Sequence, residues 1–166
     1  LIRLALSALI FLPFFRPAKL GGRAPWQALR IGFFQFGLMY VLYIQSYAYL
    51  AAWQVALFTL TTPLWVSLLS PKEYSYRLFI AALLSVLAAA LVLPSQGEAG
   101  SASWLGFALL QAANLCFAWG QLAWRRWMQA DDELQDHEAF FLPFAGALFL
   151  PALALALGVT AGHHSP

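Results

Sequence analysis

Six apolar segments follow one another along the chain, separated by short polar stretches. They cover residues 1–15, 31–50, 54–70, 78–93, 104–123 and 139–159. Apolar runs of this kind predict membrane-spanning helices, which need about 20 residues to cross the hydrocarbon core. The first run would rise only about 22 Å as a helix, which favours a span whose outer end is cut off. We therefore predict an all-α, polytopic transmembrane helix bundle with six spans.

The longest uncharged stretch covers residues 32–70 and forms the centre of this pattern. It is too long for one membrane helix and suits two helices joined by a tight turn. Tyrosines and threonines interrupt it, and polar groups in hydrocarbon are costly unless they face protein or water. The second helix contains Pro63, which donates no N–H and crowds the carbonyl of Thr59, so we expect a bend there.

Composition and charge placement give the class of protein and its orientation. The chain is 62% hydrophobic and 10% charged, whereas soluble domains carry about 25% charged residues. Eight of the nine Lys and Arg residues lie in the loops 16–30, 71–77 and 124–138. The positive-inside rule makes these loops cytoplasmic, in a multi-pass protein of the bacterial inner membrane. No basic face remains for nucleic acid.

The segment 104–123 carries amide side chains on one face. Gln111, Asn114 and Gln121 share that face by helical spacing, and small residues such as Ala108 and Ala112 lie on the opposite face. Small residues allow close helix packing, so we expect the amide face to border an interior. Gln111 and Asn114 have two open interpretations: interhelical hydrogen bonding, or a cavity that binds substrate. Three amides on one face favour the cavity.

The uncharged hairpin carries polar and aromatic stripes that suit the walls of a substrate path. Tyr40 and Tyr43 share a face of its first helix, and Thr61 and Trp65 share a face of its second. An interfacial aromatic belt is the alternative, but Tyr43 and Thr61 lie nearer the middle of their spans than a belt requires. The threonine hydroxyls could also bond their own backbone carbonyls.

Arg3 is the one basic residue outside the cytoplasmic loops, and two positions are open for its side chain. It either reaches the outer interface or points inward and binds an anionic group. The candidate substrate-cavity residues are therefore Arg3, Tyr40, Tyr43, Thr61, Trp65, Gln111, Asn114 and Trp119. Because the histidines lie in loops and no span holds an acidic residue, we expect no catalytic or metal site, no cofactor and no enzymatic activity.

Three stretches resemble one family of transporters. They are LYIQSYAYLAAWQVALFTLTTPLWVSLL at 42–69, PKEYSYR at 71–77 and GFALLQAANLCFAWGQLAWRR at 106–126. Their aromatic helix, central Pro-Leu and basic helix end resemble the EamA-type transporters of the drug/metabolite transporter superfamily. The resemblance implies two inverted five-helix repeats, with this chain covering the second to seventh of ten spans. Residues 1–94 would then belong to the first repeat, 95–103 to an external linker, and 104–166 to the second repeat.

The resemblance also implies a function. Such a protein would be a secondary transporter that exports or exchanges a small metabolite, for example an amino acid, an amine, a carboxylate or a drug-like compound. Its partners would be the lipid bilayer and a small-molecule substrate, with a homodimer left open. The alternative is a non-transporting helix bundle, such as a subunit of a membrane enzyme or of a sensor.

Overall fold

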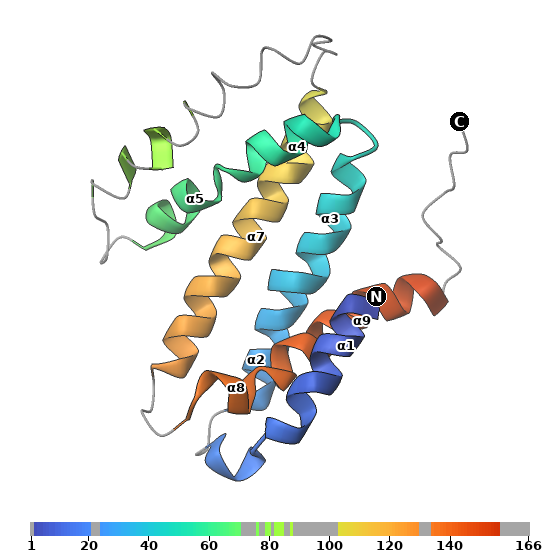
Figure 1. Cartoon of the computed structure of the whole chain (residues 1–166), viewed down its shortest axis with the longest axis vertical. Coiled ribbons are helices and arrows are strands. Elements are labelled where there is room, and N and C mark those ends of the chain that lie inside the picture. Colours follow the sequence, from blue (N-terminus) through green and yellow to red (C-terminus); the bar gives the residue numbers. More distant parts are fainter. Residues whose placement is uncertain are drawn as a thin grey trace. The chain divides into compact units, whose positions relative to one another are not determined.

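The computed structural model describes residues 2–20, 24–70, 103–129 and 134–156, together with scattered positions between 76 and 87. Every regular element in these ranges is helical (Figure 1). This confirms the prediction of an all-α membrane helix bundle. The chain forms two compact units, Leu1–Leu38 with Ala123–Pro166, and Met39–Leu122. The predicted repeat boundary at 95–103 falls largely outside the described residues and stays a prediction.

Three described helices are long and apolar enough to cross a membrane: Pro25–Ser46, Ala52–Leu69 and Trp104–Met128. They correspond to the predicted second, third and fifth spans. The first and sixth segments correspond to shorter apolar helices, Ile2–Phe14 and Phe141–Leu150. Most of the fourth segment, 78–93, lies outside the described residues, so the count of six spans stays a prediction. Large apolar side chains such as Leu9 and Phe149 are exposed on these helices, as a lipid-facing surface requires.

The second predicted span begins earlier in the structure than its apolar residues suggested. Helix α2 (Pro25–Gly32) starts at Pro25, where the fixed φ of proline suits a helix start and its missing N–H breaks no bond. A π-helical turn, η3 (Phe33–Leu38), continues into α3 (Met39–Ser46). Arg30 is therefore helical rather than in a loop, and its Cζ lies 5.0 Å from the centre of the Trp26 ring.

The first unit depends on a close crossing between the α2–η3 helix and α9 (Phe141–Ala156). Cβ atoms placed on Gly32 and Gly146 would meet the backbone of Pro143 and Leu29, respectively. A Cβ on Gly37 would lie 3.2 Å from the Ala147 carbonyl oxygen, which is a milder contact. Glycine thus lets the two helix backbones touch, and without a hydrophobic drive between helices in lipid such contact is a main source of stability.

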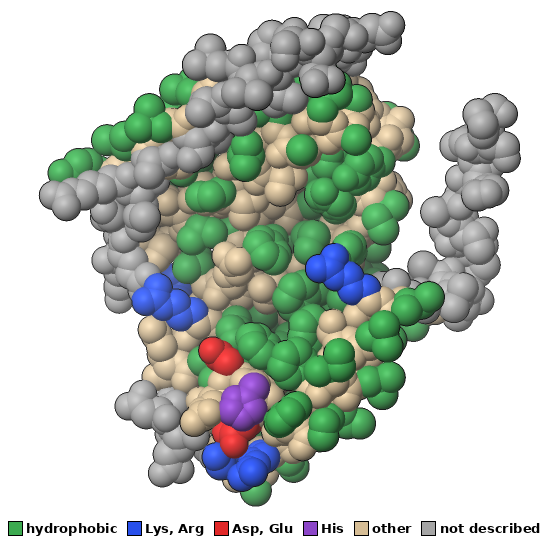
Figure 2. Space-filling view, in the orientation of Figure 1, with side chains coloured by type: hydrophobic (Ala, Val, Ile, Leu, Met, Phe, Trp, Pro, Cys, Tyr) green, Lys and Arg blue, Asp and Glu red, His purple; other side chains and the backbone are tan. Residues whose placement is uncertain are grey.

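Polar loops meet at one end of this unit, between η2 (Pro17–Leu20) and α8 (Asp136–Ala139). Lys19 Nζ donates to Glu138 Oε1 at 2.7 Å, and Arg16 Nε lies 3.6 Å from the same oxygen. The Glu138 side chain is only 6% exposed. Figure 2 shows acidic, basic and histidine side chains together around α8. The contact places loops 16–30 and 124–138 at the same end, as the charge pattern requires.

Replacing Gly32 by alanine tests the helix crossing. We expect Gly32→Ala to lower the free energy of unfolding by about 1–3 kcal/mol, because the new Cβ would force the backbone of Pro143 away. Reversible unfolding in mixed micelles measures this change. Gly37→Ala is the matched control and should be much milder, since alanine favours a helix by about 1 kcal/mol over glycine. Equal stability of Gly32→Ala and the native protein would contradict the crossing.

The Lys19–Glu138 contact predicts a pH dependence of stability. Hydrogen bonding to Lys19 lowers the pKa of Glu138 below its ordinary value. The stabilisation is therefore present above about pH 4.3 and is lost as pH falls through the lowered pKa of the folded state. Glu138→Gln should lower the melting temperature in detergent at pH 7 and have a much smaller effect at pH 3. An equal difference between the two proteins at both pH values would contradict this contact.

Candidate functional site

The second unit contains a helix that is broken inside its apolar span. Helix α4 (Ala52–Thr59) ends before α5 (Thr62–Leu69) begins, and Pro63 occupies the first turn of α5. The carbonyl of Thr59, which proline leaves without its usual donor, accepts a hydrogen bond from Thr62 Oγ1 at 2.7 Å. The helix is interrupted directly before Pro63, where a bend was expected, and a threonine hydroxyl satisfies the freed carbonyl.

Helix α7 (Trp104–Met128) supplies an amide to this break. Asn114 Nδ2 donates to the Phe58 carbonyl at 2.9 Å and to Thr61 Oγ1 at 3.2 Å. The Asn114 residue is 4% exposed. Because a carbonyl oxygen can only accept, these bonds fix which end of the Asn114 amide carries the nitrogen.

Gln111 makes a second set of bonds one turn earlier on α7. Its Oε1 accepts from Trp65 Nε1 at 2.8 Å and lies 2.9 Å from Thr61 Oγ1. Thr61 has one hydroxyl proton, which is shared between Gln111 Oε1 and the Phe58 carbonyl at 2.7 Å. The indole N–H only donates, so the amide oxygen of Gln111 must face Trp65. Gln111 Nε2 is buried and has no hydrogen-bond partner within the described part of the chain.

An apolar core lies beside these polar groups. Leu50, Val55 and Leu110 are buried together, with Tyr43 and Phe58 packed against them. The Tyr43 hydroxyl lies 3.2 Å from that of Tyr47. A Cβ on Gly106 would lie 2.7 Å from Leu50 Cγ, so α7 approaches the turn between α3 and α4 closely.

The structure brings four predicted residues into direct contact: Thr61, Trp65, Gln111 and Asn114. We call these four the amide cluster. Tyr43 joins the adjacent apolar core, Tyr40 is half-buried on α3, and Trp119 is 39% exposed on α7. Arg3 belongs to the other unit and is exposed on α1 (Ile2–Phe11). A cavity lined by all eight residues stays a prediction.

The packing faces of α7 differ from the expectation. Asn114 and Ala118 on the amide face are buried, whereas Gln121 on the same face and Ala108 on the opposite strip are exposed. The amide face therefore packs against the broken helix. The physical reason is that the break presents a carbonyl and hydroxyls, and amides bond these groups better than small apolar residues do.

Two further polar groups have structural roles that the sequence pattern did not indicate. Gln54 accepts a hydrogen bond from the Ala51 backbone N–H at 2.9 Å and so caps the start of α4. Asp136, at the start of α8, accepts from Trp124 Nε1 at 3.1 Å. The capping role of Gln54 could have been read from the sequence, because a glutamine three residues after a helix N-cap is a known capping pattern.

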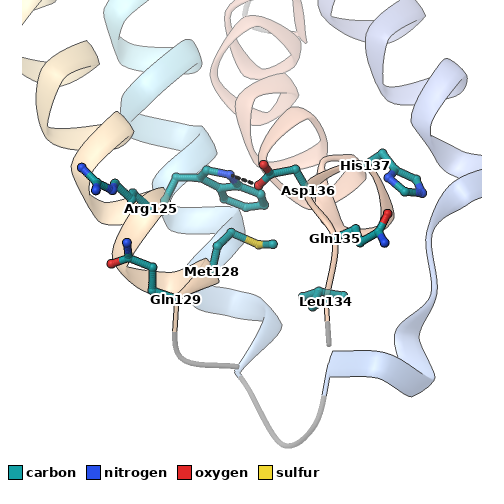
Figure 3. Close-up of a pocket in the computed structure, with 8 residues that line it drawn as sticks. Arg125, Met128, Gln129, Leu134, Gln135, Asp136 and His137 are labelled. Carbon is teal, nitrogen blue, oxygen red and sulfur yellow. Dashed lines mark hydrogen bonds between the residues drawn. The ribbon is translucent and has the colours of Figure 1, made fainter. Parts of the chain in front are cut away.

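An open pocket of about 660 Å³ lies where α7 ends and α8 begins (Figure 3). Its lining residues are Trp124, Arg125, Met128, Gln129, Leu134, Gln135, Asp136 and His137. Among the described residues, no group of three His, Cys, Asp or Glu side chains could hold a metal ion. The pocket therefore offers mixed polar and apolar contacts at the end predicted to be cytoplasmic.

Comparison with known proteins relates the chain to curated transporters. It is 32% identical over 161 residues to a protein named biotin transporter from Salmonella typhimurium, covering 95% of this chain and 53% of that protein. It is 31% identical to the biotin transporter of Escherichia coli strain K12, covering 93% and 52%. A probable biotin transporter of Pseudomonas aeruginosa is 35% identical, covering 93% and 56%.

The chain thus spans about half the length of the curated relatives that it matches. No family model matches it, and no solved structure matches it. The relatives and the apolar helices confirm a multi-pass protein of the bacterial inner membrane. The expectation that the protein is not an enzyme agrees with the names of these relatives, which are transporters.

The comparisons correct the resemblance to EamA-type drug/metabolite transporters. The relatives are named biotin transporters, and no family model supports the earlier assignment. The expectation of export loses its support as well. The motifs behind the resemblance were an aromatic helix, a central Pro-Leu and a basic helix end. Bilayer packing and the positive-inside rule select these features in many membrane proteins, so they do not identify a family.

Proposed function

We propose that this chain is part of a secondary transporter that carries biotin across the bacterial inner membrane. The observation that carries the proposal is similarity over 93–95% of the chain to proteins named biotin transporters. A non-transporting membrane enzyme or sensor subunit would not be expected to share this similarity along nearly its whole length.

The amide cluster is the proposed substrate-binding wall. Helix breaks inside a membrane are tolerated where protein or a water-filled cavity surrounds them, and transporters use them to present polar groups to substrates. Here the break exposes the Phe58 carbonyl and the Thr61 hydroxyl to the amides of α7. A substrate with its own donors and acceptors could exchange partners with these groups at little net cost, because each hydrogen bond lost is replaced.

The polar groups of biotin suit such a wall. Biotin has a neutral cyclic urea at one end, an apolar thioether ring in the middle and a carboxylate at the other end. The urea offers one acceptor and two donors, which match amide side chains. The apolar core of Leu50, Val55 and Leu110 beside the cluster suits the thioether ring and the hydrocarbon arm.

Biotin exchange in proteoliposomes tests the proposal. The protein encoded by the open reading frame that contains this chain would be reconstituted into vesicles preloaded with unlabelled biotin. The uptake of labelled biotin into these vesicles would then be measured. We expect saturable exchange that unlabelled biotin suppresses. Asn114→Ala should lower exchange by roughly tenfold, equal to about 1.4 kcal/mol, with normal membrane insertion.

Gln45→Ala is the matched control, because Gln45 is an exposed amide in the same unit. It should exchange biotin as the native protein does. Absence of biotin exchange by the native protein would contradict the proposed function. A parallel loss of insertion and exchange in Asn114→Ala would instead assign Asn114 to helix packing alone.

A further inference from the structure

The amide of Gln111 is satisfied at only one of its two ends. Its oxygen accepts from Trp65 Nε1 at 2.8 Å and is 2.9 Å from Thr61 Oγ1. Its nitrogen Nε2 is buried and has no hydrogen-bond partner within the described residues. A buried donor left without an acceptor costs about 1–3 kcal/mol. Such a group in a native structure calls for an explanation, and an acceptor on a bound molecule is one.

Asn114 leaves an acceptor in the same cluster. Its Nδ2 donates to the Phe58 carbonyl and to Thr61 Oγ1, and no hydrogen bond among the described residues engages its Oδ1. Gln111 and Asn114 are three residues apart on α7, so their side chains are neighbours on the helix surface. Counted over the described residues, the two amides together offer one unused donor group and one unused acceptor atom.

Within the described part of the chain, neutral residues surround these atoms. The described residues of the Met39–Leu122 unit include no Lys, Arg, Asp or Glu. A carboxylate brought into an apolar, uncharged site would lose its hydration without gaining a cation, which is costly. A neutral urea loses much less, and amide groups replace its hydrogen bonds one for one. The cluster therefore suits the ureido end of biotin better than the carboxylate end.

Resting on the proposed function, we propose that Gln111 is a specificity-determining residue that donates from Nε2 to the ureido carbonyl oxygen of biotin. Asn114 Oδ1 accepts from a ureido N–H beside that carbonyl. Trp65 and Thr61 act as positioning residues, because their bonds to Gln111 Oε1 turn Nε2 toward the ligand. No bond is made or broken; recognition depends on matching one donor and one acceptor.

The analogue 2-iminobiotin tests this assignment. It replaces the ureido carbonyl by a cyclic guanidine that is protonated at neutral pH, so it donates where biotin accepts. Gln111→Glu keeps an oxygen to accept from Trp65 and replaces the Nε2 donor by a second carboxylate oxygen. The measured quantity is the ratio of biotin exchange to 2-iminobiotin exchange in proteoliposomes, which does not depend on how much protein is reconstituted.

We expect the native protein to favour biotin, and Gln111→Glu to shift the ratio toward 2-iminobiotin by about tenfold or more, equal to about 1.4 kcal/mol. Gln111→Met has similar length and no polar atom, and it should lose most of the discrimination. Gln45→Glu is the control on an exposed position and should keep the native ratio. Biotin methyl ester lacks the anionic carboxylate. The ratio of its exchange to biotin exchange should be the same in every Gln111 variant as in the native protein.

The outcomes separate this inference from the proposed function. Biotin exchange by the native protein with an unchanged biotin to 2-iminobiotin ratio in both Gln111 variants would overturn the inference and leave the function standing. If a Gln111 variant changed the ratio of methyl ester exchange to biotin exchange, Gln111 would lie at the carboxyl end of biotin. That result would also overturn the inference. Failure of the native protein to exchange biotin at all would overturn the proposed function first, and the inference with it.

Discussion

The carbonyl groups freed by the helix break between Thr59 and Thr62 set the main constraint on the second unit. Inside hydrocarbon an unsatisfied backbone carbonyl costs several kcal/mol, so each one must find a donor within the protein. Thr62 Oγ1 donates to the carbonyl of Thr59, and Asn114 Nδ2 donates to that of Phe58 in addition to the backbone N–H of Thr61. The amide of Asn114 therefore adds a contact between α7 and bonds that the broken helix makes within itself.

This contact explains why part of α7 is buried. Asn114 bonds the break, and Leu110, about one turn earlier on α7, is buried together with Val55 of α4. Polar bonds of this kind between membrane helices are individually modest, typically about 0.6 kcal/mol. They can therefore be exchanged for bonds to a ligand without loss of the fold, which is the property a transport site needs.

Sequence reasoning identified the spans and the members of the amide cluster because both follow from periodicity. Helical spacing put Gln111 and Asn114 on one face, and Pro63 indicated the bend. Periodicity could not tell which face packs, because burial depends on the partner helix. It also placed the start of α2 too late, since the helix begins at Pro25, whereas Gln27 and Arg30 interrupt the apolar residues before Ile31.

The resemblance to a named family was the weakest inference, since its residues report membrane packing rather than ancestry. The glycine contacts of the first unit were also beyond sequence reasoning. Gly32 and Gly146 are 114 positions apart in the chain, and only the fold brings their helices together. The Lys19–Glu138 contact was likewise beyond sequence reasoning. The positions of Lys and Arg placed both loops on the same side of the membrane, but they did not show which residues pair.

The central claim is that biotin binds against the helix break, and site-directed thiol labelling tests it most directly. Thr61→Cys would be introduced in a Cys116→Ala background, with Ala108→Cys, on the exposed side of α7, as the reference position. The account predicts that biotin slows maleimide labelling of the cysteine at position 61 and leaves labelling at position 108 unchanged. Equal labelling of position 61 with and without saturating biotin, in protein that exchanges biotin, would contradict the account.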